Sequence, residues 1–400
     1  MAGSAFAEVT LSEIAEFRNG KALSPERYTP SGKHPVFGSN GQIARTDELL
    51  NSKPVIVIGR VGAYCGCVHY VPKASWVTDN AIVAEPKSGN DLRYLFYLLG
   101  SLELERTAIG SAQPLMTQGG LKVVRTKVPP LAKQKAIAAV LGALDDKIEL
   151  NRRMNTTLEA MARALFQSWF VDFDPVRAKL DGRQPTGLDP ATFQDSPIGP
   201  IPHEWNAGTL GDIGTNSRRS IKPNQIAPST PYIALEHMPR RCIALGDWDG
   251  SADVASGKSA FKKGEILFGK LRPYFHKVGV APFDGVCSTD ILVLSPKSPE
   301  WFGLLLGHAS SDALIQFTDL ASTGTKMPRT NWSDISSFKV ALPPNPIAAA
   351  FTKIIQPMLE RIVANIHQSR TLATLRDALL PKLLGGELTI KQTARMRNNY

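Results

Sequence analysis

Cysteine is scarce in this chain of 400 residues, which has only four. Cys65, Cys67, Cys242 and Cys287 follow no regular spacing, and this argues against a disulfide framework. The sequence also lacks a run of about 18 apolar residues, and its N-terminal MAGSAFAEVT has no signal-peptide core. We therefore expect a soluble, cytoplasmic protein that has no membrane segment.

Motifs of several enzyme classes are missing as well. We find no P-loop, no HExxH, no GxSxG and no glycine-rich nucleotide fingerprint after a strand. An adenine methyltransferase would need a D/N/S-P-P-aromatic tetrapeptide, and the two Pro-Pro pairs stand in VPPL (128–131) and LPPN (342–345). The sequence therefore predicts no catalytic site.

Two small clusters of chemically active residues favour bland interpretations. Cys65, Cys67 and His69 alternate on an expected strand, and three ligands on one flat strand rarely enclose a tetrahedral zinc ion. The Asp145-Asp146-Lys147 run is similar to a nuclease constellation, but on a helix face it is expected to be solvated charge. We predict no metal site.

Charge is the property that the chain has in excess. It carries 46 basic and 36 acidic side chains, a net charge of +10, and both halves of the sequence are positive. A basic surface of this kind favours a polyanionic partner, either nucleic acid or an acidic membrane face. The length suggests two or three domains, because single cores rarely grow beyond about 300 residues.

An internal repeat is the most informative feature of the sequence. The apolar run 55–58 is followed by GRVGAY (59–64), and the run 266–268 is followed by GKLRPY (269–274). The glycine, the cation and the tyrosine each recur 210 positions later, and the Pro-Pro pair recurs at an offset of 214. The common order of these matches predicts that a half of roughly 200 residues is duplicated.

Each half reads as a mixed α/β domain followed by a long helix that begins after its Pro-Pro pair. A segment rich in proline, glycine and aspartate separates the halves and has the composition of a linker. The expected ranges are 1–130 for the first domain, 131–173 for its helix, 174–204 for the linker, 205–343 for the second domain, 344–388 for its helix and 389–400 for a basic tail.

The two helices share a heptad pattern. Steps of seven from Ile137 give Leu144, Asn151, Leu158 and Leu165, and a companion row is Leu141, Ile148, Asn155, Ala162 and Trp169. The second helix repeats the first row as Phe351, Met358, Asn365, Leu372 and Leu379. We predict an antiparallel coiled coil whose register is set by Asn151 and Asn365; the alternative is that each helix packs on its own domain.

Candidate DNA-binding residues follow the repeat. Arg60, Lys270 and Arg272 stand at strand ends, where the backbone can approach a phosphate or a base edge. Tyr64 and Tyr274 could stack on bases or fill the core, and the core is the favoured interpretation. The remaining candidates lie in polar runs that could bind base edges or phosphates or simply form turns: Thr78, Asn80, Ser111, Gln113, Thr289, Thr325, Lys326 and Arg329.

Taken in order, these motifs resemble the specificity subunit of type I restriction–modification enzymes over essentially the whole chain. The marks are FGSNG (37–41), GRVGAY, TDNAIV (78–83), PPLAKQKAIAAVLGALDDKIELN and SWFVDFDP (168–175), then GKLRPY, STDILVL and LLPKLLGGEL. The second helix departs from the pattern, because it begins PPNPIAAAF and lacks a polar residue like Gln134.

The resemblance implies two target recognition domains, each reading one half of a split DNA sequence, joined by two spacer helices. It also implies two methylation subunits and two restriction subunits as partners; we take Trp169, Phe170 and Phe173 as candidate partner contacts. The chain itself would bind no cofactor: S-adenosylmethionine would belong to the methylation subunit, and ATP and Mg to the restriction subunit.

We therefore expect an α/β (α+β) protein that acts as a non-catalytic specificity subunit on double-stranded DNA. Two alternatives stay open at this point. One is a self-sufficient DNA-modifying enzyme with a diverged site, and the other is a scaffold that binds DNA without sequence preference.

Overall fold

A computed structural model describes residues 6–110, 113–174, 193–252, 256–322, 327–388 and 390. The chain divides into two compact units. Unit 1 comprises residues 1–147 and 372–400, and unit 2 comprises residues 148–371. Each described unit contains one globular part and a segment of each of two long helices.

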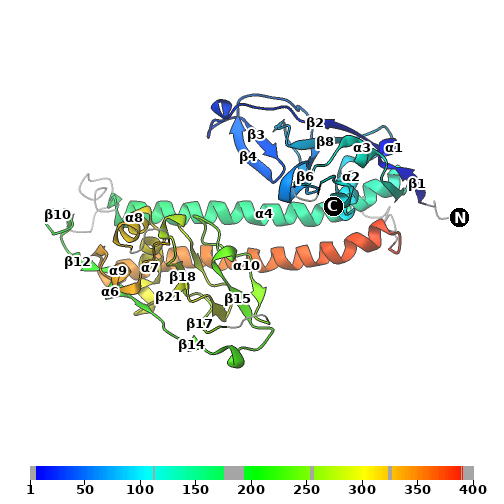
Figure 1. The fold of residues 1–400 in the computed structure, drawn as a ribbon. Coiled ribbons are helices and arrows are strands. Elements are labelled where there is room, and N and C mark those ends of the chain that lie inside the picture. The colour runs from blue at the N-terminus through cyan, green and yellow to red at the C-terminus, as the bar shows by residue number, and fades with distance from the viewer. Residues whose placement is uncertain are drawn as a thin grey trace, which may run out of the picture. The chain divides into compact units, whose positions relative to one another are not determined.

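The long helices are α4, Leu131–Phe170, and α10, Asn345–Leu384, each with 40 residues (Figure 1). At 1.5 Å per residue each extends about 60 Å. Within unit 2, Asn155 of α4 bonds Asn365 of α10, and farther along α4 the Phe166 ring lies 6.4 Å from Phe351 near the start of α10. Moving forward along one helix means moving backward along the other, so the predicted antiparallel coiled coil is confirmed.

The same pairing of helices occurs within unit 1. Arg376 of α10 donates to Asp145 of α4 at 2.7 Å, and Ile137 and Leu141 of α4 share a hydrophobic cluster with Leu383 of α10. That cluster also includes globular residues, as does the one in unit 2. Each helix segment therefore packs on its globular part as well as on the other helix.

Unit 1 contains a four-stranded antiparallel sheet in the order β2-β8-β5-β6 and a three-stranded sheet in the order β4-β3-β7. A further pair, β1 and β9, joins the two ends of the globular segment. The strands are β1 Ala7–Thr10, β2 Ala15–Asn19, β3 His34–Gly38, β4 Gly41–Thr46, β5 Val55–Gly59, β6 Val68–Val71, β7 Trp76–Val77, β8 Ala81–Pro86 and β9 Arg125–Val128. The short helices are α1 Leu11–Ile14, α2 Leu92–Ser101 and α3 Gln118–Lys122.

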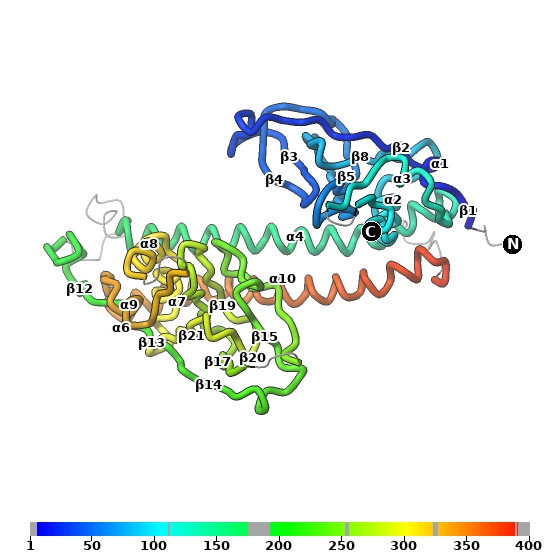
Figure 2. Tube along the Cα trace, in the orientation of Figure 1, coloured from blue at the N-terminus to red at the C-terminus, as the bar shows by residue number. Residues whose placement is uncertain are grey.

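Unit 2 repeats this plan. Its four-stranded sheet has the order β13-β21-β18-β19, its second sheet has the order β14-β17-β20-β15-β16, and β12 pairs with β22 as β1 does with β9. Figure 2 draws the Cα trace of this unit. The strands are β10 Phe193–Gln194, β11 Ile201–Pro202, β12 Asn206–Thr209, β13 Gly214–Asn216, β14 Ser220–Ile221, β15 Pro231–Ile233, β16 Asp249–Gly250, β17 Lys258–Phe261, β18 Ile266–Gly269, β19 Val278–Val280, β20 Gly285–Cys287, β21 Ile291–Pro296 and β22 Lys339–Leu342. The short helices are α6 Leu210–Ile213, α7 Phe302–Ala309, α8 Asp312–Ala321 and α9 Trp332–Ser336. The four-stranded sheets and the terminal strand pairs match in order and confirm the internal repeat, while the second sheet has five strands in unit 2 and three in unit 1.

The central strand of each unit is buried on both faces. Alternate side chains of a strand point to opposite faces, so Ile56 and Ile58 join the cluster that includes α2 and α4, while Val55 and Val57 join a separate valine-rich cluster. In unit 2, Ile266 and Phe268 of β18 likewise join one hydrophobic cluster, while Leu267 between them joins another on the opposite face. Each strand is thereby fixed firmly, and so is the position at which it ends.

The starts of the two long helices differ in structure as they do in sequence, where only the first has a polar residue at the position of Gln134. Gln134 of α4 is buried, accepts from the backbone N–H of Asp91 at 2.9 Å, and donates to Asn90 and to the Pro129 carbonyl. The corresponding residue of α10 is Ala348, which is fully buried. Gln134 therefore fastens α4 to the loop before α2, whereas α10 uses apolar packing at this position.

Among the described helices, none is both long and apolar enough to cross a membrane.

Candidate nucleic-acid interface

A tight turn follows the central strand of unit 1. The strand β5 ends at Gly59, whose N–H donates to the Cys67 carbonyl at 2.8 Å and whose own carbonyl accepts from Gly66 at 2.9 Å. A Cβ atom at Gly59 would lie 2.1 Å from the carbonyl oxygen of Tyr64, so only glycine lets the chain fold back this closely. The short 3-10 helix Gly62–Tyr64 forms the tip.

Unit 2 builds the same turn after β18, with the 3-10 helix Pro273–Phe275 at its tip. Gly269 donates to the Lys277 carbonyl at 2.8 Å, as Gly59 does to Cys67. Four further backbone hydrogen bonds correspond between the units, each from an N–H to a carbonyl. In unit 1 they run from Arg60 to Asn80, Cys65 to Gly62, Gly62 to Pro114 and Met116 to Arg60. In unit 2 their counterparts run, in the same order, from Lys270 to Asp290, Phe275 to Arg272, Arg272 to Pro328 and Thr330 to Lys270. The repeated sequence element is therefore a repeated three-dimensional element.

The backbone conformation of the turn is also retained. Gly62 and Gly66 have φ of 71° and 92°, and the corresponding Arg272 and His276 have φ of 51° and 50°. Glycine adopts positive φ freely, but other residues there cost of order 1–3 kcal/mol. Unit 2 thus keeps the shape of the turn despite strain, which is a pattern that clusters at functional sites.

Polar residues before β8 and β21 lie against each turn. Asn80 is exposed, and its carbonyl accepts from the N–H of Arg60 at 3.0 Å. The guanidinium of Arg60 donates to the carbonyl of Asp79 at 3.1 Å. Thr78 is placed differently, because its side chain is only 4% exposed and its hydroxyl has no hydrogen-bond partner among the described residues.

A second loop borders each turn on its other side. Gln113 is exposed and precedes Pro114, whose carbonyl accepts from Gly62 at 3.1 Å. In unit 2, Arg329 follows Pro328 and forms an ion pair with Asp290 at 3.3 Å. Three candidates of these loops, Ser111, Thr325 and Lys326, lie outside the described residues.

Unit 2 also has a polar pocket of about 480 Å³ beside its turn. Three candidates, Lys270, Thr289 and Arg329, line it together. The sequence interpretation missed further lining residues, which come from the end of β13, the β13–β14 connection, the start of β14 and the residue before α9: Asn216, Ser217, Arg218, Ser220 and Asn331. The Arg218-Arg219 pair was the available signal. Amide, hydroxyl and cationic donors around one hollow can bind phosphate oxygens or base edges.

The two tyrosines are exposed, so the favoured prediction that they fill the core is wrong. The relative exposure of Tyr64 is 47% and that of Tyr274 is 48%. The core is already filled by the side chains of β5 and β18, and each tyrosine stands at the tip of a turn beyond the strand end. Tyr274 packs edge-on against Phe275 at 4.7 Å, and Phe275 is stacked in turn by the Arg240 guanidinium at 4.0 Å.

The central asparagines of the coil lie together within unit 2. Asn151, which is fully buried, donates to Gln368 at 2.9 Å and to Ser369 at 3.2 Å, and its amide nitrogen lies 3.5 Å from the backbone oxygen of Asn365. The side chain of Asn365 donates instead to Asn155, of the companion row, at 2.8 Å. Their role in setting register stays a prediction.

The aromatic residues at the end of α4 pack within unit 2. Phe170 and Phe173 are buried, and both lie against Trp205, with ring centroids 5.7 and 5.3 Å apart. Trp169 is partly exposed and lies 5.7 Å from Phe351. Partner contact by these residues stays a prediction, and Trp169 has the most exposed surface for it.

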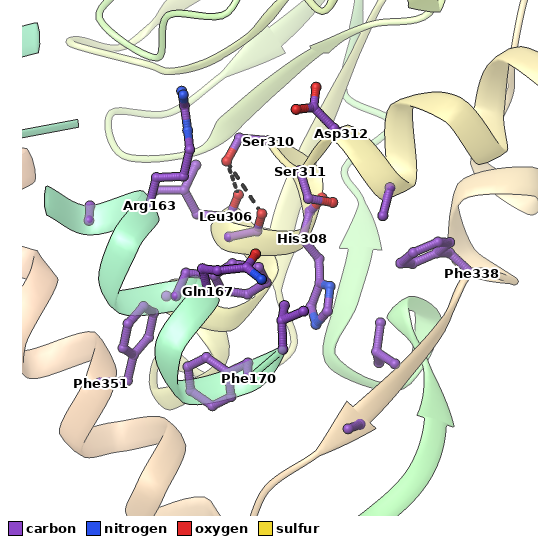
Figure 3. A pocket seen from close by; sticks show the side chains of 18 of the residues that line it. Arg163, Gln167, Phe170, Leu306, His308, Ser310, Ser311, Asp312, Phe338 and Phe351 are labelled. Atoms are coloured by element: carbon purple, nitrogen blue, oxygen red, sulfur yellow. Dashed lines mark hydrogen bonds between the residues drawn. The ribbon is translucent and has the colours of Figure 1, made fainter. Parts of the chain in front are cut away.

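An apolar pocket of about 420 Å³ lies beside this cluster (Figure 3). Arg163, Gln167 and Phe170 of α4 border one side, and the region of His308 to Asp312 borders the other. Burial lowers the pKa of His308 to about 3, so this imidazole is neutral near pH 7. Among the described residues, no cluster of three or more His, Cys, Asp or Glu could hold a metal ion.

Duplicated α/β units that contribute to a pair of antiparallel helices define a distinctive class of fold. A crystal structure of the type I restriction–modification S subunit from M. genitalium has this fold, with a TM-score of 0.62 at 18% identity over 94% of this chain and 96% of that one. Residues 4–160 match the family model described as the type I restriction modification DNA specificity domain.

Curated relatives carry the match along most of the chain. The type I restriction enzyme MjaIX specificity subunit of Methanocaldococcus jannaschii is 28% identical over 323 residues, covering 77% of this chain and 71% of that protein. The HindI specificity subunit of Haemophilus influenzae is 26% identical over 375 residues, covering 78% and 81%. By these matches the chain is similar to type I restriction–modification specificity subunits over most of its length.

Proposed function

We propose that this chain reads a two-part sequence on double-stranded DNA, with one part recognised by the globular portion of each unit. The observation that carries the proposal is the repeated turn, whose five backbone hydrogen bonds and two positive φ angles recur in both units. Two copies of one recognition element suit a target that is met twice. The net charge of +10 favours the same polyanionic partner.

The two units read different sequences in this proposal, because the residues around their turns differ. Unit 2 places Lys270 and Arg329 beside its polar pocket. Unit 1 has Arg60 at the position of Lys270, but it has the apolar Leu115 at the position of Arg329, and Asn80 where unit 2 has Asp290. Cations on phosphates fix the position of the protein on the duplex, while side chains on base edges select the sequence. A change of edge-binding residues therefore changes the half-site that is read.

The chain performs no chemistry of its own in this proposal. It positions two methylation subunits, which hold S-adenosylmethionine, and restriction subunits, which hold ATP and Mg. The absence of methylase, P-loop and metalloprotease motifs from the sequence supports the division of labour. Trp169 and the exposed surface of the coil are the proposed seats of partners.

Selection from a random duplex library by the purified full chain tests the proposal. We expect the recovered duplexes to share two short conserved blocks separated by a gap without preference. A single block, or no enrichment at all, would contradict the proposal. In a parallel assay, turnover of S-adenosylmethionine by the chain without a methylation subunit would contradict its non-catalytic part.

A further inference from the structure

The exposed tyrosines at the two turns are placed where a binding partner can bury them. Tyr64 and Tyr274 occupy the same position between two positive-φ residues, and their exposures, 47% and 48%, agree closely. A large aromatic side chain that is half exposed at two equivalent places lacks part of the roughly 1.5–3 kcal/mol that full burial in a core provides. This cost is recovered if each ring is buried by a partner.

The geometry points to Tyr64 and Tyr274 as matched stacking side chains, each of which inserts between neighbouring base pairs in its own half-site and opens the base stack. The inference deepens the proposed function and rests on it, since it names how each unit engages its duplex. Insertion of an apolar or aromatic wedge unstacks a step and kinks the duplex, so the energy of deforming the sequence adds to its recognition.

The support of each tyrosine suits this role. In unit 2, Phe275 holds Tyr274 edge-on, while Arg240 covers the Phe275 ring at 4.0 Å. In unit 1, the turn that carries Tyr64 closes tightly on the strand end, because an added Cβ at Gly59 would lie 2.1 Å from the Tyr64 carbonyl oxygen. A wedge must be rigid because a flexible side chain would fold away rather than separate two bases.

Apolar neighbours extend the tip in both units. Leu115, which is 36% exposed, forms a β-bridge with Val61 next to the unit 1 turn. In unit 2, Met327 is 47% exposed and precedes Pro328, whose carbonyl accepts from the turn at Arg272. Leucine and methionine are residue types that proteins insert between base steps beside a leading wedge.

The charges around the tips favour DNA over a protein partner. Arg60 adjoins the first turn, and Lys270 and Arg240 adjoin the second. The buried centre of a protein–protein interface is typically depleted of charged residues, while a duplex requires cations around any inserted ring to neutralise phosphates. We therefore assign the tyrosines to the duplex.

Permanganate oxidation of unstacked thymines tests the inference on a duplex recovered by selection, with thymine placed at successive steps. The full chain is used without a methylation subunit, because that subunit could unstack a base by itself. We expect one reactive step in each half-site. Tyr64→Ala should abolish the reactive step in one half-site and Tyr274→Ala the step in the other, with binding weakened by about 5- to 150-fold in each case.

Matched variants separate stacking from other roles. Tyr64→Phe and Tyr274→Phe keep the ring and should keep the reactive steps, whereas Leu49→Ala and Leu320→Ala remove other exposed apolar side chains and should change nothing. Specific binding with no reactive step, or reactive steps that persist in both alanine variants, would overturn the inference and leave the proposed function intact. Alanine variants that bind DNA normally but fail to assemble with a methylation subunit would also overturn it and assign the tips to a protein partner. Failure of the wild-type chain to enrich any sequence would overturn both.

Discussion

The buried amide pair of the coil allows a quantitative double-mutant test. Asn365, 3% exposed, donates to Asn155, 8% exposed, at 2.8 Å. Replacing either residue by leucine, which is similar in size, leaves the other amide buried without its partner, at a cost of about 1–3 kcal/mol. Replacing both residues removes the two polar groups together. The free energy of unfolding of the double variant should therefore lie within about 1 kcal/mol of the wild-type value.

Urea unfolding of the wild type, both single variants and the double variant measures these four free energies at an unchanged m-value. The single costs should sum to about 2–6 kcal/mol, far above the cost of the double variant. Glu149 and Arg153, an exposed ion pair on the same helix at 2.8 Å, provide a control cycle whose coupling should be only about 0.3–0.5 kcal/mol. A double variant as unstable as the sum of the single variants would refute the interpretation that the two amides satisfy each other.

Three further predictions concern the turn and the buried imidazole. Gly59→Ala should abolish half-site selection by unit 1, because the added Cβ would lie 2.1 Å from the Tyr64 carbonyl oxygen. The control is Gly89→Ala, where φ is 86° and the space around the added Cβ is open. It should cost only about 1–2 kcal/mol of stability and leave half-site selection intact. Lys270→Ala should weaken binding to all sequences and lower the salt slope by about 1 if this side chain meets phosphate, and an effect confined to one base pair would instead place it on a base edge. The lowered pKa of His308 means that the unfolded state binds more protons between about pH 3 and 6.5, so the wild type should lose about 2 kcal/mol of stability between pH 6.5 and pH 5. His308→Leu should flatten that dependence in urea titrations, and an equally steep loss in the variant would show that another group is responsible.

The repeat, the coil and the strand ends could be predicted because each leaves a periodic or local signal in the sequence. The offset of 210 located both turns, the offset of 214 located the starts of both helices, and heptad spacing found Asn151, Asn155 and Asn365. The stagger of the two helices has no such signal. Asn365 therefore pairs through its side chain with Asn155, while Asn151 reaches Gln368 and Ser369.

Exposure at the turns could not be read from residue type. An aromatic residue beside a buried strand is equally compatible with core and surface, and the direction of the turn beyond Gly59 and Gly269 decides between them. Only some of the residues that line the pocket of unit 2 could be predicted from the sequence, for a related reason. Arg218 and Ser220 lie about 50 residues before Lys270 in the sequence, and sheet pairing rather than local sequence brings them to one hollow.

An exchange of one recognition segment shows whether each unit reads its own half of the target. Residues 1–130 would be replaced by the equivalent segment of a relative whose target is known, and the hybrid chain would select duplexes from a random library. We expect one conserved block to change to the relative's sequence while the other block stays as it was, because contacts to base edges are local. A change in both blocks, or in neither, would contradict the claim that each unit reads its own half of the target.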